Sequence, residues 1–267
     1  MGLDINKVYN MDCLQGMKQL DSNSIDLTVT SPPYDNLRDY KGYSFNFKDI
    51  AKEMYRVTKH GGVVVWVVGD ATINGSETGT SFKQALFFKE CGFDLHDTMI
   101  YKKNMCPFPD TVRYYNIFEY MFVLSKGKPK TVNLLKDREN KWNPENYDKI
   151  NLRKKDGSLE SRDINKKHSK FGVRFNIWEY NVGFNFSTTD KIAKKHPAIF
   201  PEQLAEDHIK SWSNKKDFVM DPFCGSGTTL VVAKYLDRNY IGFDISKEYV
   251  KISNERLNKR TVINEWI

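Results

Sequence analysis

The sequence FVMDPFCGSGTT, residues 218–229, joins an apolar run to a glycine-rich turn and then to the beginning of a helix. A second apolar run, 239–243, follows this helix and ends at Asp244. Strand, turn, helix and strand in this order predict a βαβ unit with two parallel strands. The free N–H groups and the dipole at the helix N-terminus favour an anionic group at the turn. Asp244 lies 17 residues after Gly227, about where an acidic side chain reaches the ribose hydroxyls of a bound nucleoside.

The glycine turn favours a nucleoside ligand that carries no pyrophosphate. A phosphate-binding loop of the form G-x-x-x-x-G-K-[ST] requires a lysine that is missing here, and Leu230 occupies the place of the third glycine of a dinucleotide site. Asp221, just before the turn, would repel pyrophosphate. A ligand with a carboxylate, an ammonium group and a ribose fits better, and S-adenosylmethionine is such a ligand. Taken alone, the motif is also compatible with a tight turn that only closes an ordinary βαβ unit.

A second stretch, IDLTVTSPPYDNLRDY at 25–40, ends an apolar strand in Ser31-Pro32-Pro33-Tyr34. Two consecutive prolines have no N–H and hold φ near about −65°, so the strand cannot continue through them. The tetrapeptide therefore presents a hydroxyl, a rigid carbonyl between the two prolines and an aromatic ring. A proline-rich strand end without further function is the alternative for this motif alone.

Apolar spacing elsewhere predicts an α/β protein that is interrupted by an insertion. The run VVVWVV at 63–68 predicts a strand buried on both faces of a sheet. From 125 to about 186 the apolar pattern gives way to polar residues with isolated aromatics, which predicts a separate, loop-rich subdomain. The remaining expected elements are helices at 47–57, 81–91, 201–210 and 247–258, and strands at 98–101 and 120–124.

Charge and composition narrow the class of protein. The 267 residues carry a net charge of +7, and the segment 126–174 alone carries +8. This segment is either a solvated basic face or the contact surface for a polyanion. Four cysteines without a C-x-x-C pair make a zinc site or a disulfide framework unexpected, and we expect no metal. Without a long apolar run or a signal-peptide pattern, we expect a soluble, cytoplasmic protein that does not contact membranes.

Three motifs together carry a family resemblance. TSPPY at 30–34, KKHPAIFPEQL at 194–204 and DPFCGSGTT at 221–229 resemble an amino-type DNA methyltransferase of the β order, in which the catalytic motif precedes the target-recognition region and the cofactor turn comes last. The resemblance covers the chain outside 126–185. It implies an α/β fold with a doubly wound, mostly parallel sheet of the S-adenosylmethionine-dependent methyltransferase type. This sheet is circularly permuted and carries a basic, loop-rich insertion.

The resemblance also implies a division of the chain and a set of site residues. Residues 1–125 would form the catalytic half, 126–186 the target-recognition insertion, and 187–267 the cofactor-binding half. The residues it assigns to catalysis are Ser31, Pro32, Pro33 and Tyr34. Those it assigns to the cofactor are Asp12, Phe200, Pro201, Asp221, Pro222, Phe223, Gly225, Gly227, Thr228 and Asp244.

Some of these residues have competing interpretations. Phe200 and Pro201 would flank the methionine portion of the cofactor, and Asp244 would bind the ribose. Asp12 would touch the adenine ring, but an N-cap of a helix explains it nearly as well. His196 in the same motif as Phe200 is expected to be structural rather than a general base, because its place in the motif is not next to the target amine.

The expected substrate is double-stranded DNA. Arg38, Lys154 and Lys155 are the candidate phosphate contacts. The aromatic residues expected to pack a small core or touch bases in the insertion are Trp142, Tyr147, Phe171 and Phe175. The target base would be swung out of the duplex to reach the site.

The first residue of the tetrapeptide indicates which base is methylated. In the family, serine at this position is usual for cytosine-N4 enzymes and aspartate for adenine-N6 enzymes, so Ser31 favours cytosine N4 and leaves adenine N6 as the alternative. An inactive DNA-binding protein that retains the fold is the alternative of another class, and methylation of RNA or protein amides is a third. A cognate restriction endonuclease is a possible partner, and the chain would act as a monomer or homodimer in the cytoplasm or nucleoid of a bacterium, an archaeon or a phage host.

Overall fold

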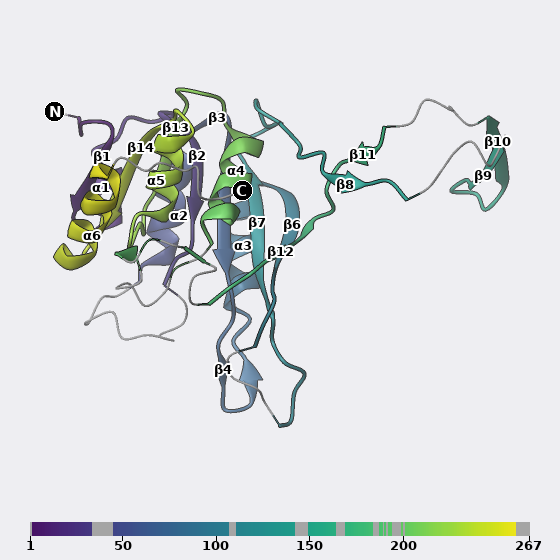
Figure 1. Ribbon diagram of the computed structural model, residues 1–267, viewed down its shortest axis with the longest axis horizontal. Helices are drawn as coiled ribbons and strands as arrows, with labels where there is room; N and C mark the ends of the chain where they lie inside the picture. Colours follow the sequence, from purple (N-terminus) through teal and green to yellow (C-terminus); the bar gives the residue numbers. More distant parts are fainter. Residues whose placement is uncertain are drawn as a thin grey trace. The chain divides into compact units, whose positions relative to one another are not determined.

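A mixed sheet of eight strands organises the larger part of the chain (Figure 1). The computed structural model describes residues 2–33, 45–106, 111–141, 149–163, 169–183, 187–188, 190, 192–193, 199 and 201–259. Within the sheet β7 runs antiparallel to both of its neighbours, and the other pairs are parallel. In spatial order the strands are β1 (Lys7–Asn10), β14 (Asn239–Asp244), β13 (Phe218–Asp221), β2 (Ile25–Thr30), β3 (Thr58–Val68), β7 (Phe118–Ser125), β6 (Asp94–Lys103) and β12 (Ile177–Tyr180).

Helices cover both faces of this sheet. The helices are α1 (Cys13–Met17), α2 (Phe47–Val57), α3 (Thr80–Glu90), α4 (Glu202–Trp212), α5 (Thr228–Tyr235) and α6 (Lys247–Asn258). The helices α1, α2 and α3 contact one another in series and form one layer, and α4, α5 and α6 form the other, which lies in front of the sheet in Figure 1. Among the described residues, no helix has both the length and the apolar character needed to cross a membrane.

The strand β3 shows why the apolar run at 63–68 has no polar alternation. Val64, Trp66 and Val68 pack in one core cluster with apolar side chains of α1, α2 and α3. Val63 and Val65 are equally buried and point to the opposite face, because successive side chains of a strand alternate. A central strand covered by helices on both sides must be apolar at every position. The prediction of a doubly covered strand is therefore confirmed.

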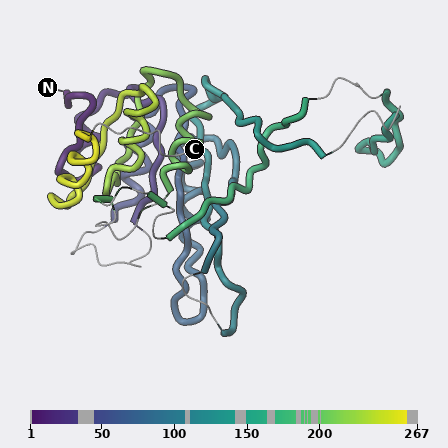
Figure 2. Tube along the Cα trace, viewed as in Figure 1, coloured from purple at the N-terminus to yellow at the C-terminus, as the bar shows by residue number. Residues whose placement is uncertain are grey.

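Strands from the early and the late part of the described chain lie side by side in one half of the sheet. β13 and β14 come late in the sequence, yet they lie between β1 and β2, which come from its beginning. Figure 2 shows the purple N-terminal segment beside the yellow helix α6, and β1 and α6 are in contact. This order confirms the expected doubly wound, mostly parallel sheet with a circular permutation.

Residues 134–175 form a second compact unit. It contains two small antiparallel pairs, β9 (Lys149–Arg153) with β10 (Leu159–Asp163), and β8 (Arg138–Glu139) with β11 (Phe171–Gly172). A third short pair, β4 (Thr72–Ile73) with β5 (Ser76–Glu77), belongs to the larger unit.

The compact unit is shorter than the segment 126–186 that the sequence set apart. Within that segment, β12 pairs in parallel with β6 and extends the main sheet. Trp178 and Tyr180 are buried and the two residues alternating with them are exposed, as expected for an edge strand. Four alternating residues within a polar stretch are too short a signal to separate a strand from a loop, so the sequence did not reveal β12.

Candidate functional site

The described part of the first motif, 30–33, and the second motif, 221–229, meet at the carboxyl ends of two neighbouring strands. β2 and β13 are parallel neighbours, with Leu27 beside Val219 and Thr28 beside Met220. At their carboxyl ends the hydroxyl of Thr30 donates a hydrogen bond to Oδ1 of Asp221 over 2.7 Å, and both residues are buried. From β2 the chain continues to β3 on one side, and from β13 to β14 on the other. Such a switch point is where open α/β sheets bind ligands.

Asp221 is a buried carboxyl group held by hydrogen bonds. Only 2% of the residue is exposed, and its Oδ1 also accepts the backbone N–H of Phe223 over 3.1 Å. Burial raises the pKa of Asp221 from its ordinary 3.8 to about 6, against the lowering effect of the hydrogen bonds from Thr30 and Phe223. A pKa this close to neutrality in a buried group at a switch point is typical of a functional residue.

The glycine turn has a backbone that other residues adopt only with strain. Gly225 and Gly227 have φ of +48° and +78°. A Cβ on Gly227 would also lie 2.8 Å from Oγ of Ser253 in α6. Gly227 is the N-cap of α5 and offers no side chain to its N–H groups. The turn therefore approaches α6 closely and leaves the start of α5 without a side-chain cap, which suits an anionic ligand group.

Asp244 fastens the turn to the end of β14. Its Oδ2 accepts the N–H of Gly225 over 3.0 Å, and its Oδ1 accepts the N–H of Ser246 over 2.8 Å. Burial raises the pKa of Asp244, and these two hydrogen bonds partly oppose the shift. Each carboxylate oxygen can accept a second hydrogen bond, so the side chain can still receive two ribose hydroxyls.

Asp12 lies near the carboxyl ends of the same set of parallel strands. It is the N-cap of α1, where its Oδ1 accepts the N–H of Gln15 over 3.1 Å. It follows β1, whose last residue, Asn10, pairs with Asp244 and donates to the carbonyl of Asp244 over 3.0 Å. The N-cap interpretation is therefore confirmed, and the contact with an adenine ring stays a prediction.

The remaining predicted site residues divide between described and undescribed parts of the chain. In the tetrapeptide, Pro32 is buried and Ser31 and Pro33 are partly buried. Pro201 is buried and is the N-cap of α4. Pro222 is buried and Phe223 is partly buried, directly after β13. The predicted residues that lie outside the described part are Tyr34, Arg38, Trp142, Tyr147, His196 and Phe200.

The predicted phosphate contacts of the compact unit are on a hairpin. Lys154 and Lys155 are exposed at the turn between β9 and β10, where the N–H of Lys154 donates to the carbonyl of Ser158. The ammonium of Lys154 lies 3.6 Å from Glu160. Phe175 is exposed, and the guanidinium carbon of Arg138 lies over its ring, 4.5 Å from the ring centroid. The aromatic residues described in this unit are thus surface residues rather than a core.

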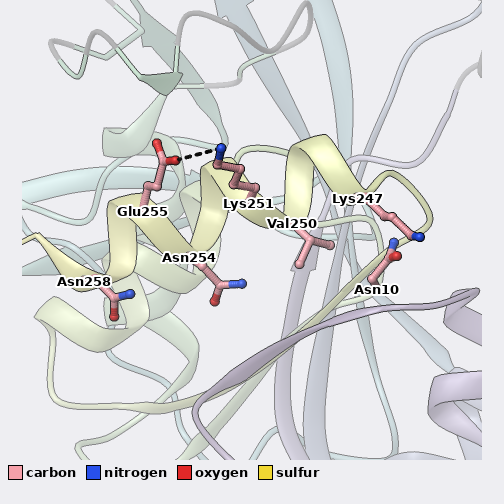
Figure 3. Close-up of a pocket in the computed structure, with 7 residues that line it drawn as sticks. All are labelled: Asn10, Lys247, Val250, Lys251, Asn254, Glu255 and Asn258. Carbon is pink, nitrogen blue, oxygen red and sulfur yellow. Dashed lines mark ion pairs between the residues drawn. The ribbon is translucent and has the colours of Figure 1, made fainter.

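A shallow depression runs along the outer side of α6 (Figure 3). Its side chains are mostly polar, and Lys251 pairs with Glu255 at 4.0 Å across it. The lining residues are Asn10, Lys247, Val250, Lys251, Asn254, Glu255 and Asn258. None of the predicted site residues lines this depression, so we do not assign it to the cofactor.

Sequence reasoning missed one residue that holds the glycine turn. Arg256 in α6 is buried and donates to the carbonyl of Ser226 over 2.6 Å. Within the amphipathic pattern of 247–258 an arginine is expected on the solvent side of a helix. No signal in the sequence distinguished it from the exposed charges around it.

A family model described as DNA methylase, of the N6/N4 type, matches residues 25–255. The chain belongs to this family. The cofactor prediction is confirmed with it, because the family uses S-adenosylmethionine.

Individual relatives of this methylase agree with the family assignment. It is 62% identical over 243 residues to the orphan methyltransferase M.BamHII of Bacillus amyloliquefaciens. The aligned region covers 91% of this chain and 92% of that relative. Its fold is similar to that of the PvuII DNA methyltransferase, a cytosine-N4-specific enzyme, with a TM-score of 0.71 and 20% identity. The superposition covers 98% of this chain and 89% of the PvuII enzyme. The complex of M1.HpyAVI with S-adenosylmethionine gives a TM-score of 0.62 at 24% identity, and the superposition covers 95% of this chain and 99% of M1.HpyAVI.

Proposed function

We propose that this methylase transfers the methyl group of S-adenosylmethionine to the exocyclic N4 amine of a cytosine that is flipped out of double-stranded DNA. The observation that carries the proposal is the hydrogen bond between Thr30 and Asp221. It joins the last residue before the catalytic tetrapeptide to the first residue of the cofactor motif, although they are far apart in sequence. A methyl donor at the glycine turn and an amine at the tetrapeptide would therefore be neighbours.

The residues around the turn fit S-adenosylmethionine. The uncapped start of α5 after Gly227 suits the carboxylate of the methionine portion. Asp244 retains acceptor capacity for the ribose hydroxyls. Asp221, once ionised, places a negative charge at the carboxyl end of β13, where a cationic cofactor would bind. When bound, the cofactor supplies an electrophilic methyl group on a sulfonium.

The tetrapeptide would prepare the amine for attack. The lone pair of an exocyclic amine is delocalised into the ring, and acceptors at its two N–H groups draw it back onto nitrogen. The hydroxyl of Ser31 and the carbonyl of Pro32 are the two acceptors in our proposal. Pro32 is buried and its φ is fixed by its ring, which holds that carbonyl in place.

The chemical step is a direct transfer. The nitrogen forms a bond to the methyl carbon as the carbon–sulfur bond breaks, and the amine then loses one proton to solvent. Most of the rate acceleration would come from holding the two reactants in line. Tyr34 would stack on the flipped base and keep it in place, as aromatic side chains do for extruded bases.

The choice of cytosine rests on Ser31. A serine at the head of the tetrapeptide is the feature that favours N4 over adenine N6, and the same geometry could serve either amine. The PvuII enzyme, whose fold is similar at 20% identity, is cytosine-N4-specific, but a similarity of fold does not select the base.

The test is expression in a host whose DNA carries no methylated bases, followed by mass spectrometry of nucleosides. We expect N4-methylcytosine. N6-methyladenine alone would overturn the choice of base. No methylated nucleoside from a folded, cofactor-binding protein would favour the inactive DNA-binding alternative. A host with the empty vector provides the control.

A further inference from the structure

Arg256 is an arginine with almost no exposure to water. Only 1% of its side chain is exposed, although it lies in the last turn of α6 near the end of the described chain. Burying a guanidinium is costly unless its five donors find acceptors. Its contacts therefore show what the fold requires of it.

One side of the guanidinium holds the glycine turn. Nη1 donates to the carbonyl of Ser226 over 2.6 Å and lies 3.3 Å from the hydroxyls of Ser226 and Thr228. A neighbouring residue of α6, Ser253, donates to the carbonyl of Gly225 over 2.7 Å. Two carbonyl oxygens of the turn are thus bonded to α6 instead of facing the anionic group of a ligand at the start of α5.

The other side of the guanidinium reaches the segment before α4. Nη2 donates to Oε1 of Glu202 over 2.5 Å, and Nε donates to Oδ2 of Asp190 over 3.2 Å. Thr188 donates to the same oxygen of Glu202 over 2.7 Å and accepts the N–H of Asp190. Glu202 follows Pro201 directly, so this side of the guanidinium holds the other segment that we expect to flank the cofactor.

The positive charge of Arg256 acts on the pKa of the two carboxyl groups beside it, those of Glu202 and Asp190. Burial raises the pKa of Glu202, and the Arg256 charge opposes that rise. At Asp190 burial also acts to raise the pKa, but hydrogen bonds from Ile192 and Lys259 together with the charges of Arg256 and Lys259 bring it below its ordinary value. The guanidinium therefore neutralises the partly buried carboxylate of Glu202, which has no other basic partner among the described residues, and it shares that of Asp190 with Lys259.

We propose that Arg256 is a positioning residue for the cofactor, which fixes the glycine turn at Ser226 and Thr228 and ties it to Asp190 and Glu202, so that the two cofactor-facing segments adopt their binding shape together. This role rests on the proposed function, because it presumes that the turn binds S-adenosylmethionine. The role also predicts that a lysine would not suffice at this position. Only the planar fork of arginine donates in several fixed directions at once, whereas an ammonium group acts as a point charge.

The decisive variant is Arg256→Lys. It keeps a positive charge beside Glu202 but cannot span both segments. The matched control is Arg56→Lys, because Arg56 in α2 also donates to backbone carbonyls, those of Met17 and Leu20, and to a glutamate, Glu53. Arg56 makes these contacts away from the glycine turn. Both variants lose a guanidinium that is bonded to backbone carbonyls and to a glutamate; 32% of the Arg56 side chain is exposed, against 1% of that of Arg256.

Three equilibrium measurements and steady-state kinetics on the full chain separate positioning from stability. Calorimetric titration gives the affinity for S-adenosylmethionine without DNA, fluorescence anisotropy gives the affinity for duplex DNA without cofactor, and urea unfolding gives stability. We expect Arg256→Lys to weaken cofactor binding at least tenfold and to raise the KM for the cofactor in parallel. DNA affinity and kcat at saturating cofactor should change less than threefold. Arg56→Lys should leave cofactor affinity within twofold of wild type.

A second variant tests the connection between the two segments. Glu202→Gln leaves Arg256 on the glycine turn but removes the negative charge of its anchor at α4, so that only a neutral acceptor remains, and we expect a loss of cofactor affinity of about threefold or more. Since both residues would act through one unit, Arg256→Lys with Glu202→Gln should lose little more affinity than Arg256→Lys alone. Losses that multiply would contradict the connection. If Arg256→Lys is too unstable to titrate, Glu202→Gln alone decides, and unchanged affinity in it overturns the proposal.

The outcomes also distinguish this proposal from the proposed function. If the wild type binds S-adenosylmethionine and Arg256→Lys binds it equally tightly, the positioning role is overturned and the methylase function is left intact. A wild-type chain that binds no S-adenosylmethionine would contradict both, because there would be no cofactor to position. The identity of the methylated base does not enter these measurements.

Discussion

The raised pKa of Asp221 predicts how the stability of this methylase depends on pH. An acid whose folded pKa lies above its unfolded value binds its proton more tightly in the folded state. Its favourable contribution is therefore complete below the unfolded pKa, near 3.8, and is lost as the pH rises through the folded value of about 6. The shift of roughly 2 pKa units corresponds to a total loss of about 3 kcal/mol, of which about 1.4 kcal/mol falls between pH 5 and pH 8.

Asp221→Asn should remove this dependence while keeping the local geometry. The amide oxygen of asparagine can accept the same hydrogen bonds from the Thr30 hydroxyl and the Phe223 N–H. Urea unfolding at pH 5 and pH 8 gives the free energy of unfolding of both proteins. Between these two pH values the wild type should lose about 1.4 kcal/mol more than the variant, because the other titrating groups are common to both.

A control residue carries the opposite sign. Asp237 is exposed, and the nearby Lys216 charge, helped by a hydrogen bond from Lys215, lowers its pKa. A group with a lowered pKa loses its contribution only in acid below its unfolded value, so Asp237→Asn should not alter the change between pH 5 and pH 8. Identical pH dependence in wild type and Asp221→Asn would show that Asp221 is already ionised at pH 5 and would refute the reasoning.

Three further predictions concern the proposed site. Ser31→Ala removes one acceptor from the target amine, so single-turnover transfer should slow about ten- to a hundredfold with affinities for cofactor and DNA nearly unchanged; full activity would remove Ser31 from the mechanism. Asp244→Ala should weaken S-adenosylmethionine in calorimetric titration by about 1–3 kcal/mol, because the ribose acceptors are lost, and unchanged affinity would reject the ribose assignment. Neutralising Lys154 and Lys155 together should flatten the salt dependence of duplex binding by roughly 0.9 per lost contact in log K against log salt, while a wild-type slope would identify them as ordinary solvated charges.

Local helices and strands could be predicted from the sequence where a capping residue or an apolar pattern marks their ends. The helices expected at 47–57 and 247–258 have those bounds in the structure, and their N-caps Asn46 and Ser246 accept the N–H groups three residues on. The strand at 25–30 ends where the first proline prevents its continuation. The helices expected at 81–91 and 201–210 differ by one or two residues at their ends, as is usual where no capping side chain fixes the start.

The motifs and their order also sufficed for the family and the cofactor. The segments that carry these motifs lie 191 residues apart in sequence, and the bond between Thr30 and Asp221 shows how they meet. This success has a simple cause, because glycine at a left-handed position and proline after a strand constrain the backbone through their own chemistry.

Features that depend on which segments pack together could not be predicted and are visible only in the folded chain. β3 begins at Thr58, before the expected start at 63, because its pairing with β2 continues across an irregularity next to Leu27. Arg256 is buried because α6 packs over the glycine turn, and nothing in its own helix indicates this. The pKa of Asp221 rises because β2, β13 and α5 together exclude water from it. Burial and charge environment are sums over residues distant in sequence, so no local pattern can carry them.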